Sequence, residues 1–228
     1  MKPRLFWLIS AAIASFVFGA LSRGAERFDY QVRNDFFAGF TGNAEAMARA
    51  MKTTETILAE NPNHAEALVW HGAGVYFQAG KAFRSGDSEK GMELAEKGIG
   101  EMDKAVQIAP DDIGVRVPRG SVLLTATRFQ QGPHVEPLIQ RGLSDFQHVY
   151  ELQSAQLSTM PSHPKGELLF GLADANNRLG KKDQAKIFYE RAAAELPGTP
   201  YERNAQEWLA SGQLSAQQSG CLGCHTGK

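Results

Sequence analysis

The chain has 228 residues, with 24 basic and 25 acidic side chains and a formal net charge of −1 at pH 7. This length is sufficient for one domain with its own hydrophobic core, and the near-neutral charge argues against nucleic acid and against a polybasic contact with lipid as partners. Both cysteines of the chain lie in one short motif close to its C-terminus.

The first 25 residues have the pattern of an export signal. Lys2 and Arg4 form a basic start, and an uncharged apolar run over 5–21 follows it. The run is longer than a standard signal core and slightly short for a membrane-spanning helix. We therefore predict that residues 1–25 are either a signal peptide cleaved near Ser22 or an uncleaved anchor in the inner membrane. Both predictions place the rest of the chain in the periplasm or another extracytoplasmic space.

Residues 26–212 have a composition typical of helices, and we predict an all-α domain over this range. Ala, Glu, Leu, Lys and Gln are abundant, and Gly and Pro fall between the apolar segments. No convincing stretch alternates apolar and polar residues as a half-buried strand would. In such a chain, a pattern that recurs at a fixed spacing indicates a fold built from repeated helical units.

The segment 166–197 has the clearest repeat pattern, with two short helices joined at Gly180. Small residues allow two antiparallel helices to approach closely, and an aromatic side chain fills the space between neighbouring pairs. The predicted packing positions are Leu169, Leu172, Ala173, Ala185, Tyr189 and Ala192, with Pro197 closing the unit. The segment resembles a tetratricopeptide repeat along its whole length, except that Asn176 stands where the family usually has an aromatic residue.

Other parts of the domain match the same pattern less closely. A second unit covers 65–110, and because it exceeds the ~34 residues of one repeat, we predict an extended helix or a long loop around 81–94. We expect a degenerate earlier repeat at 50–62. A further helix pair is expected at 115–129 and 136–153, and a terminal capping helix at 201–210. The capping helix would cover the last pair with Trp208 and Leu209.

Together these segments resemble tetratricopeptide repeats over most of 31–197. The resemblance implies a right-handed superhelix with a concave groove, which this family uses to bind peptides or partner proteins. It implies no specific ligand. The alternative is a plain helical bundle in which the repeat pattern is a coincidence.

The tail, residues 213–228, contains a Cys-x-x-Cys-His motif at Cys221, Cys224 and His225. Two thiols at this spacing match the two vinyl groups of haem, and the adjacent histidine falls beneath the iron. We therefore predict one covalent haem c, with thioether links at both cysteines and His225 as the proximal ligand. The tail resembles the opening of a class I cytochrome c, where a short helix, here beginning at Ser215, leads into the motif. A dithiol or disulfide pair and a metal contact shared with a partner are the alternatives.

Residues 226–228 follow the motif, and we expect the haem faces to be covered by a helical-repeat surface. This surface would belong to the same chain, to a neighbouring copy or to a redox partner. The segment 160–164 is the best candidate for the sixth iron ligand, since it combines the sulfur of Met160 and the imidazole of His163 with a proline-stiffened loop. Its alternative role is a surface linker between helix pairs. The other candidate ligands are His64, His71, His134 and His148.

The chain lacks the sequence signatures of common enzyme active sites, so we expect it not to be an enzyme. The leading hypothesis is an exported helical-repeat scaffold with one c-type haem, acting in electron transfer or docking within a periplasmic redox assembly. A second hypothesis is a periplasmic binding module like those of cytochrome maturation, in which the two cysteines are a thiol site or a self-ligand. A third is a haem sensor or enzyme with an open sixth position.

Overall fold

The structure is a computed structural model that describes residues 27–214. Within this range the chain forms nine α-helices and two short 3-10 helices, so the predicted all-α class is confirmed. The elements are α1 (Asp29–Phe40), α2 (Ala44–Glu60), α3 (Ala65–Arg84), α4 (Ser88–Ile108), α5 (Ile113–Ala126), η1 (Thr127–Phe129), α6 (Val135–Leu152), η2 (Ser154–Gln156), α7 (Ser162–Arg178), α8 (Lys182–Glu195) and α9 (Pro200–Ser211). The predicted export signal and the haem motif lie outside the described residues.

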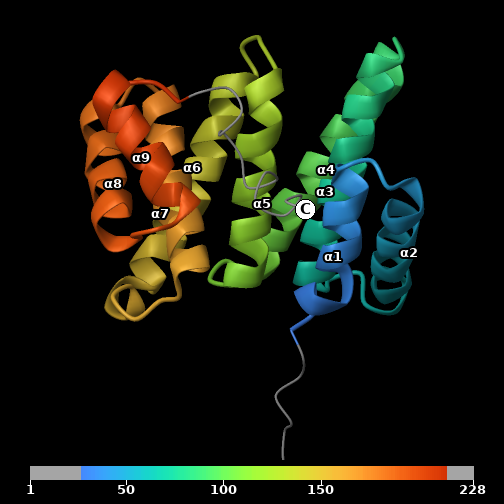
Figure 1. Cartoon of the computed structure of the whole chain (residues 1–228). Helices are drawn as coiled ribbons and strands as arrows, with labels where there is room; N and C mark the ends of the chain where they lie inside the picture. The colour runs from blue at the N-terminus through green and yellow to red at the C-terminus, as the bar shows by residue number, and fades with distance from the viewer. Residues whose placement is uncertain (1–26, 215–228) are drawn as a thin grey trace, which may run out of the picture.

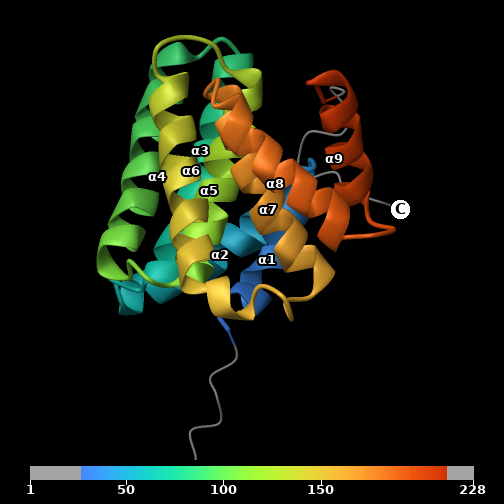
Figure 2. The ribbon, with the colours of Figure 1, turned by 90° about the vertical axis from the view of Figure 1, so that its left-hand side faces the viewer.

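Consecutive helices pack as hairpin-like pairs: α1 with α2, α3 with α4, α5 with α6, and α7 with α8. Figure 1 shows the pairs following one another across the molecule, with α9 against the last of them. The odd-numbered helices also contact each other in sequence, from α1 through α3, α5 and α7 to α9. Figure 2, turned by 90°, shows α4 and α6 on the side of the molecule away from α9.

The pair α7–α8 contains the predicted repeat unit, and its packing agrees with the sequence pattern. All six predicted packing positions of this unit are fully buried. Gly180 joins the two helices with a φ of 75°, which a residue without a Cβ adopts easily. Tyr189 stacks on Trp208 of α9 with ring centroids 4.5 Å apart, so it fills the space between this pair and the capping helix. The buried Asn176 side chain donates a 2.8 Å hydrogen bond to the Leu172 carbonyl.

The extra length of the 65–110 unit lies in its helices and not in a long loop. Helices α3 and α4 have 20 and 21 residues, and a short turn capped by Asp87, which accepts a bond from the Lys90 amide, joins them. Gly72 and Gly98 face each other where the two helices cross, and the absence of side chains there lets the backbones touch. The result is the hairpin that projects at the upper right of Figure 1.

The last described helix, α9, has clear signals at both ends. The Thr199 hydroxyl accepts a 3.2 Å bond from the Glu202 amide at its start. Gly212 ends it with a φ of 73°, and its amide donates to the Trp208 carbonyl. Trp208 is buried as predicted, whereas Leu209 is 37% exposed, because only one face of α9 meets α7 and α8.

We predict that a chain ending at Leu214 unfolds cooperatively and keeps its helix content. The core clusters are formed by residues of the helices themselves, and Leu214 completes the cluster beneath α9. Far-ultraviolet circular dichroism during thermal unfolding measures this, with the full-length chain as the control. A loss of helicity in the shortened chain would show that the tail is part of the core.

Among the described helices, none combines the length and the apolar character required to cross a membrane.

Candidate functional site

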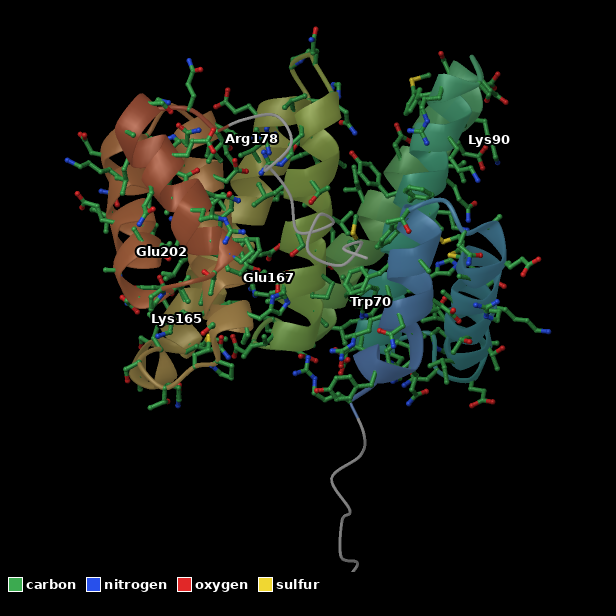
Figure 3. All side chains as sticks on the ribbon, in the orientation of Figure 1. Trp70, Lys90, Lys165, Glu167, Arg178 and Glu202 are labelled. Atoms are coloured by element: carbon green, nitrogen blue, oxygen red, sulfur yellow. The ribbon has the colours of Figure 1, made fainter. Side chains whose placement is uncertain are left out.

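A groove with a volume of about 2480 Å³ runs along the row of odd-numbered helices. Most of its lining residues come from α1, α3, α5 and the start of α7, and the rest come from α2, α4, α6 and the turns between helices. Figure 3 shows two lining residues, Trp70 of α3 and Glu167 of α7, to either side of α5. Small-molecule pockets usually measure ~300–1,000 Å³, so this groove has room for a polypeptide segment or a large planar group.

Four aromatic side chains from α1 and α3 form one side of the groove, which we call the aromatic wall. Its members are Phe37, Phe40, Trp70 and Phe77. Phe37 meets Trp70 edge-on with ring centroids 5.9 Å apart, and Phe40 lies 5.2 Å from Phe77. The buried Trp70 indole nitrogen has no hydrogen-bond partner among the described residues. The wall therefore offers aromatic, apolar surface against which a large apolar group can pack.

The segment 160–164 lies at the α7 end of the groove, and both Met160 and His163 line it. The prediction that the whole segment is a loop is wrong, because α7 begins at Ser162 and includes His163 and Pro164. Proline is tolerated in the first turn of a helix, where the amide has no intrahelical acceptor. The imidazole of His163 therefore projects from a rigid helix end, and only Met160 and Pro161 precede the helix.

His163 and Met160 have different surroundings. The Nδ1 atom of His163 lies 3.3 Å from the hydroxyl of Tyr201 in α9, within hydrogen-bonding distance. The imidazole is exposed to the groove. Met160 is half-buried and packs against the hydrophobic cluster between α5, α6 and α7. The start of α7 and the residues just before it thus bring an imidazole and a sulfur to the same end of the groove.

Three of the other candidate histidines are engaged elsewhere. His71 is buried, and its Nδ1 lies 2.6 Å from the Glu101 carboxylate of α4, so it is a core histidine with a polar partner. His64 caps α3 by accepting a bond from a backbone amide. His148 lies 2.7 Å from the Asp111 carboxylate. None of the three lines the groove, so these histidines are poorly placed for a ligand bound there.

His134 is the remaining candidate, and it lines the groove from the turn before α6. The groove therefore contains three of the predicted iron-ligand side chains, those of Met160, His163 and His134. They come from separate turns and elements. Within residues 27–214, no group of three or more His, Cys, Asp or Glu side chains is arranged to hold a metal ion.

A buried ionic network holds α5, the middle helix of the groove, against its neighbours. The Arg119 guanidinium makes two 2.7 Å bonds to the fully buried Asp145 carboxylate of α6 and one 2.8 Å bond to Asp103 of α4. Arg116 adds a 3.0 Å bond to Asp145. Two arginines three positions apart in one helix point to the same side, but the sequence does not reveal their partners.

Tyr76 is the titratable side chain most deeply set among the groove-lining residues of α3. Its hydroxyl accepts a 3.0 Å bond from the Gln130 side chain, and burial raises the pKa of the phenol above its ordinary value. The hydroxyl therefore stays protonated at neutral pH. Tyr76 itself therefore adds no charge beside the aromatic wall.

Of the residues that sequence reasoning selected, Cys221, Cys224 and His225 lie outside the described residues. Sequence reasoning missed the aromatic wall and Tyr201. The signal for the wall was present, because Phe37 and Phe40 are one helical turn apart in α1, and Trp70 and Phe77 are two turns apart in α3. Nothing in the sequence near Tyr201 points to His163.

No family model matches the chain, and no curated protein or solved structure is detectably similar to it. A function for this chain therefore depends on its own residues and on the groove that they form.

Proposed function

We propose that the protein is an exported helical-repeat scaffold with one covalent haem c near its C-terminus. Its role would be electron transfer, or docking, within a periplasmic redox assembly. The observation that carries the proposal is the motif of Cys221, Cys224 and His225, which contains both cysteines of the chain and whose spacing suits haem attachment. The basic and apolar pattern of residues 1–25 supports it, because haem is attached to such motifs outside the cytoplasm.

We infer further that the helical pairs form a tetratricopeptide-like superhelix. Two features support this: the pairwise packing of consecutive helices and the contacts between successive odd-numbered helices. In such an array the first helix of each pair lines the inner surface. The groove has the corresponding position along α1, α3, α5 and α7.

The groove is a suitable surface to cover the faces of the haem. A bound haem supplies one-electron chemistry at its iron, and the protein supplies placement and ligation. The aromatic wall would exclude water from a porphyrin face, and Met160 or His163 would supply the sixth ligand. The partner in electron transfer would be another redox protein, and residues 5–21 would hold the assembly at the membrane if they stay uncleaved.

Intact mass tests this proposal. We expect protein from a host that matures c-type cytochromes to carry the mass of one haem, with both thiols blocked to alkylation. The Cys221→Ser/Cys224→Ser double variant is the control and should carry none. The same spectrum reports whether the N-terminal segment is cleaved. Haem that extracts into acidified organic solvent from the denatured protein would contradict covalent attachment.

A second candidate function is a periplasmic binding module without haem, and the size of the groove favours it. At about 2480 Å³ the groove exceeds the volume that a small ligand needs, and an extended peptide would fill it. In this case Cys221 and Cys224 would be a thiol site. The visible spectrum separates the candidates: a low-spin six-coordinate haem supports electron transfer, a high-spin haem that binds CO supports a sensor or enzyme, and no haem supports the binding module.

A further inference from the structure

We propose that residues 215–228 fold back into the groove of their own chain, and that His163, oriented by Tyr201, binds the haem iron opposite His225. The inference rests on the proposed function, since it requires a haem at Cys221 and Cys224. The inference goes beyond the proposed function by naming the occupant of the groove, the sixth ligand and the residue that orients this ligand. Three observations carry it: the surroundings of His163, those of Met160, and the position of Leu214.

Tyr201 is held firmly enough to orient a ligand. Its side chain is buried between α7 and α9, with its ring centroid 6.2 Å from that of Phe170. Gly166 of α7 faces the ring so closely that a Cβ there would overlap it. The tyrosine hydroxyl is therefore fixed in place beside His163.

A fixed hydroxyl at Nδ1 prepares the imidazole of His163 for coordination. Histidines that bind metals usually make a hydrogen bond through one ring nitrogen and coordinate through the other, and the bond determines the tautomer and the ring orientation. In the tautomer whose Nδ1–H donates to the Tyr201 hydroxyl oxygen, 3.3 Å away, Nδ1 has the first role and Nε2 has the second. Nε2 is then the coordinating nitrogen, and it belongs to a side chain that lines the groove.

Met160 is less suited to this role. Its side chain packs against the cluster that contains Leu157 and Leu168. To reach an iron atom in the groove, the thioether would have to leave these contacts, and the close packing of the core opposes this. His163 is exposed and lines the groove, so a ligand there can reach its imidazole without displacing the hydrophobic cluster.

The tail is long enough to reach His163 in the same molecule. Tyr201 lies at the start of α9 and Leu214 just beyond its end, so Leu214 and His163 are separated by roughly the length of α9, ~18 Å. Leu214 packs against the cluster that contains Tyr201 and Trp208, so the last described residue lies on the same cluster as the tyrosine beside His163. From Leu214 the chain to Cys221 spans up to ~25 Å when extended. The haem can therefore reach His163 without any movement of α9.

The composition of the tail agrees with a place in a groove. From Gln213 to Gly227 it contains no Asp, Glu, Lys, Arg or Pro, and most of its residues are small. This part of the tail therefore brings no charged side chain into the groove when it docks. A segment joined to its own groove by a short connection has an effective concentration on the order of millimolar. The chain's own groove is thus favoured over that of a second copy at micromolar concentration.

The test uses the full chain with its haem attached, followed by visible and electron paramagnetic resonance spectra. We expect the unmodified protein to show a low-spin haem with two histidine ligands, unchanged over a roughly hundred-fold dilution. His163→Ala should lose this spectrum, whereas His148→Ala, a histidine outside the groove, should keep it. Tyr201→Phe should keep the low-spin spectrum but raise the midpoint potential, because the imidazole loses the hydrogen bond that increases its basicity. Circular dichroism checks that each variant stays folded.

Several results would overturn the inference. An unchanged spectrum in His163→Ala would place the ligand elsewhere, and loss of the low-spin spectrum in Met160→Ala alone would assign it to the sulfur. A low-spin fraction that falls with dilution would identify a second copy as the occupant. In all three cases intact mass still shows the haem, so the proposed function stands. A mass without haem would overturn both.

Discussion

Asp145→Ala is expected to destabilise the helical domain by about 3–5 kcal/mol, the range found when one partner of a buried ion pair is removed. Asp145 is fully buried and accepts two 2.7 Å bonds from Arg119 and one 3.0 Å bond from Arg116. Without it, Arg119 keeps only its bond to Asp103, and a largely buried cation loses most of its compensation. Urea unfolding followed by circular dichroism measures the change in the free energy of unfolding.

The control for this prediction is Arg141→Ala. Arg141 bonds to Asp103 at 2.8 Å in the same network, but its side chain is 44% exposed. Exposed ion pairs contribute ~0–1 kcal/mol, so the control should remain close to the unmodified protein. Equal losses in the two variants would mean that burial does not distinguish the two pairs and that the network is not the main link between α5 and its neighbours.

The network also bears on the groove. Arg119 joins α5 to α4 and α6 through Asp103 and Asp145, and α5 is the middle helix of the groove. If the network is lost, α5 is free to shift relative to α3 and α7. We therefore expect changes at Asp145 to affect any ligand that contacts both the aromatic wall and His163, although Asp145 itself does not line the groove.

Gly98→Ala is expected to destabilise the protein by about 2–3 kcal/mol, the upper part of the range for overpacking a close contact. A Cβ at Gly98 would lie 2.7 Å from the Gly72 carbonyl oxygen and 2.7 Å from the Tyr76 amide nitrogen. Both are backbone atoms of α3, so no side-chain rotation relieves the overlap and the two helices must separate. For a domain of this size we expect the melting temperature to fall by ~4–12 °C.

Gly100→Ala is the matched control, because the position lies in the same helix and a Cβ there meets nothing within 4 Å. Alanine favours the helical conformation over glycine by ~0.5–1 kcal/mol, so this variant should be slightly more stable than the unmodified protein. The two substitutions are therefore expected to change the free energy of unfolding in opposite directions, although their positions are only two residues apart in α4. If Gly98→Ala is as stable as Gly100→Ala, the backbones of α3 and α4 do not meet at Gly72.

The helical pairs could be predicted from the order of residues along the chain, because their determinants are local. The buried positions of α7 and α8, the turn at Gly180 and the end of α9 at Gly212 follow from residue size, helical spacing and the conformational freedom of glycine. The haem prediction is local in the same way, since Cys221, Cys224 and His225 adjoin one another along the chain. It remains a prediction until the mass of the protein is measured.

The formation of the groove and the identity of the side chains that line it depend on contacts between residues far apart in the chain. Arg119 meets Asp145 across 26 positions, and His163 meets Tyr201 across 38. Such contacts depend on the angle and distance between helices, and the packing of many side chains determines these together. For the same reason the sequence could not separate His71, which is buried against Glu101, from His163, which lines the groove. Both are single histidines in helices, and their roles differ because different helices pack beside them.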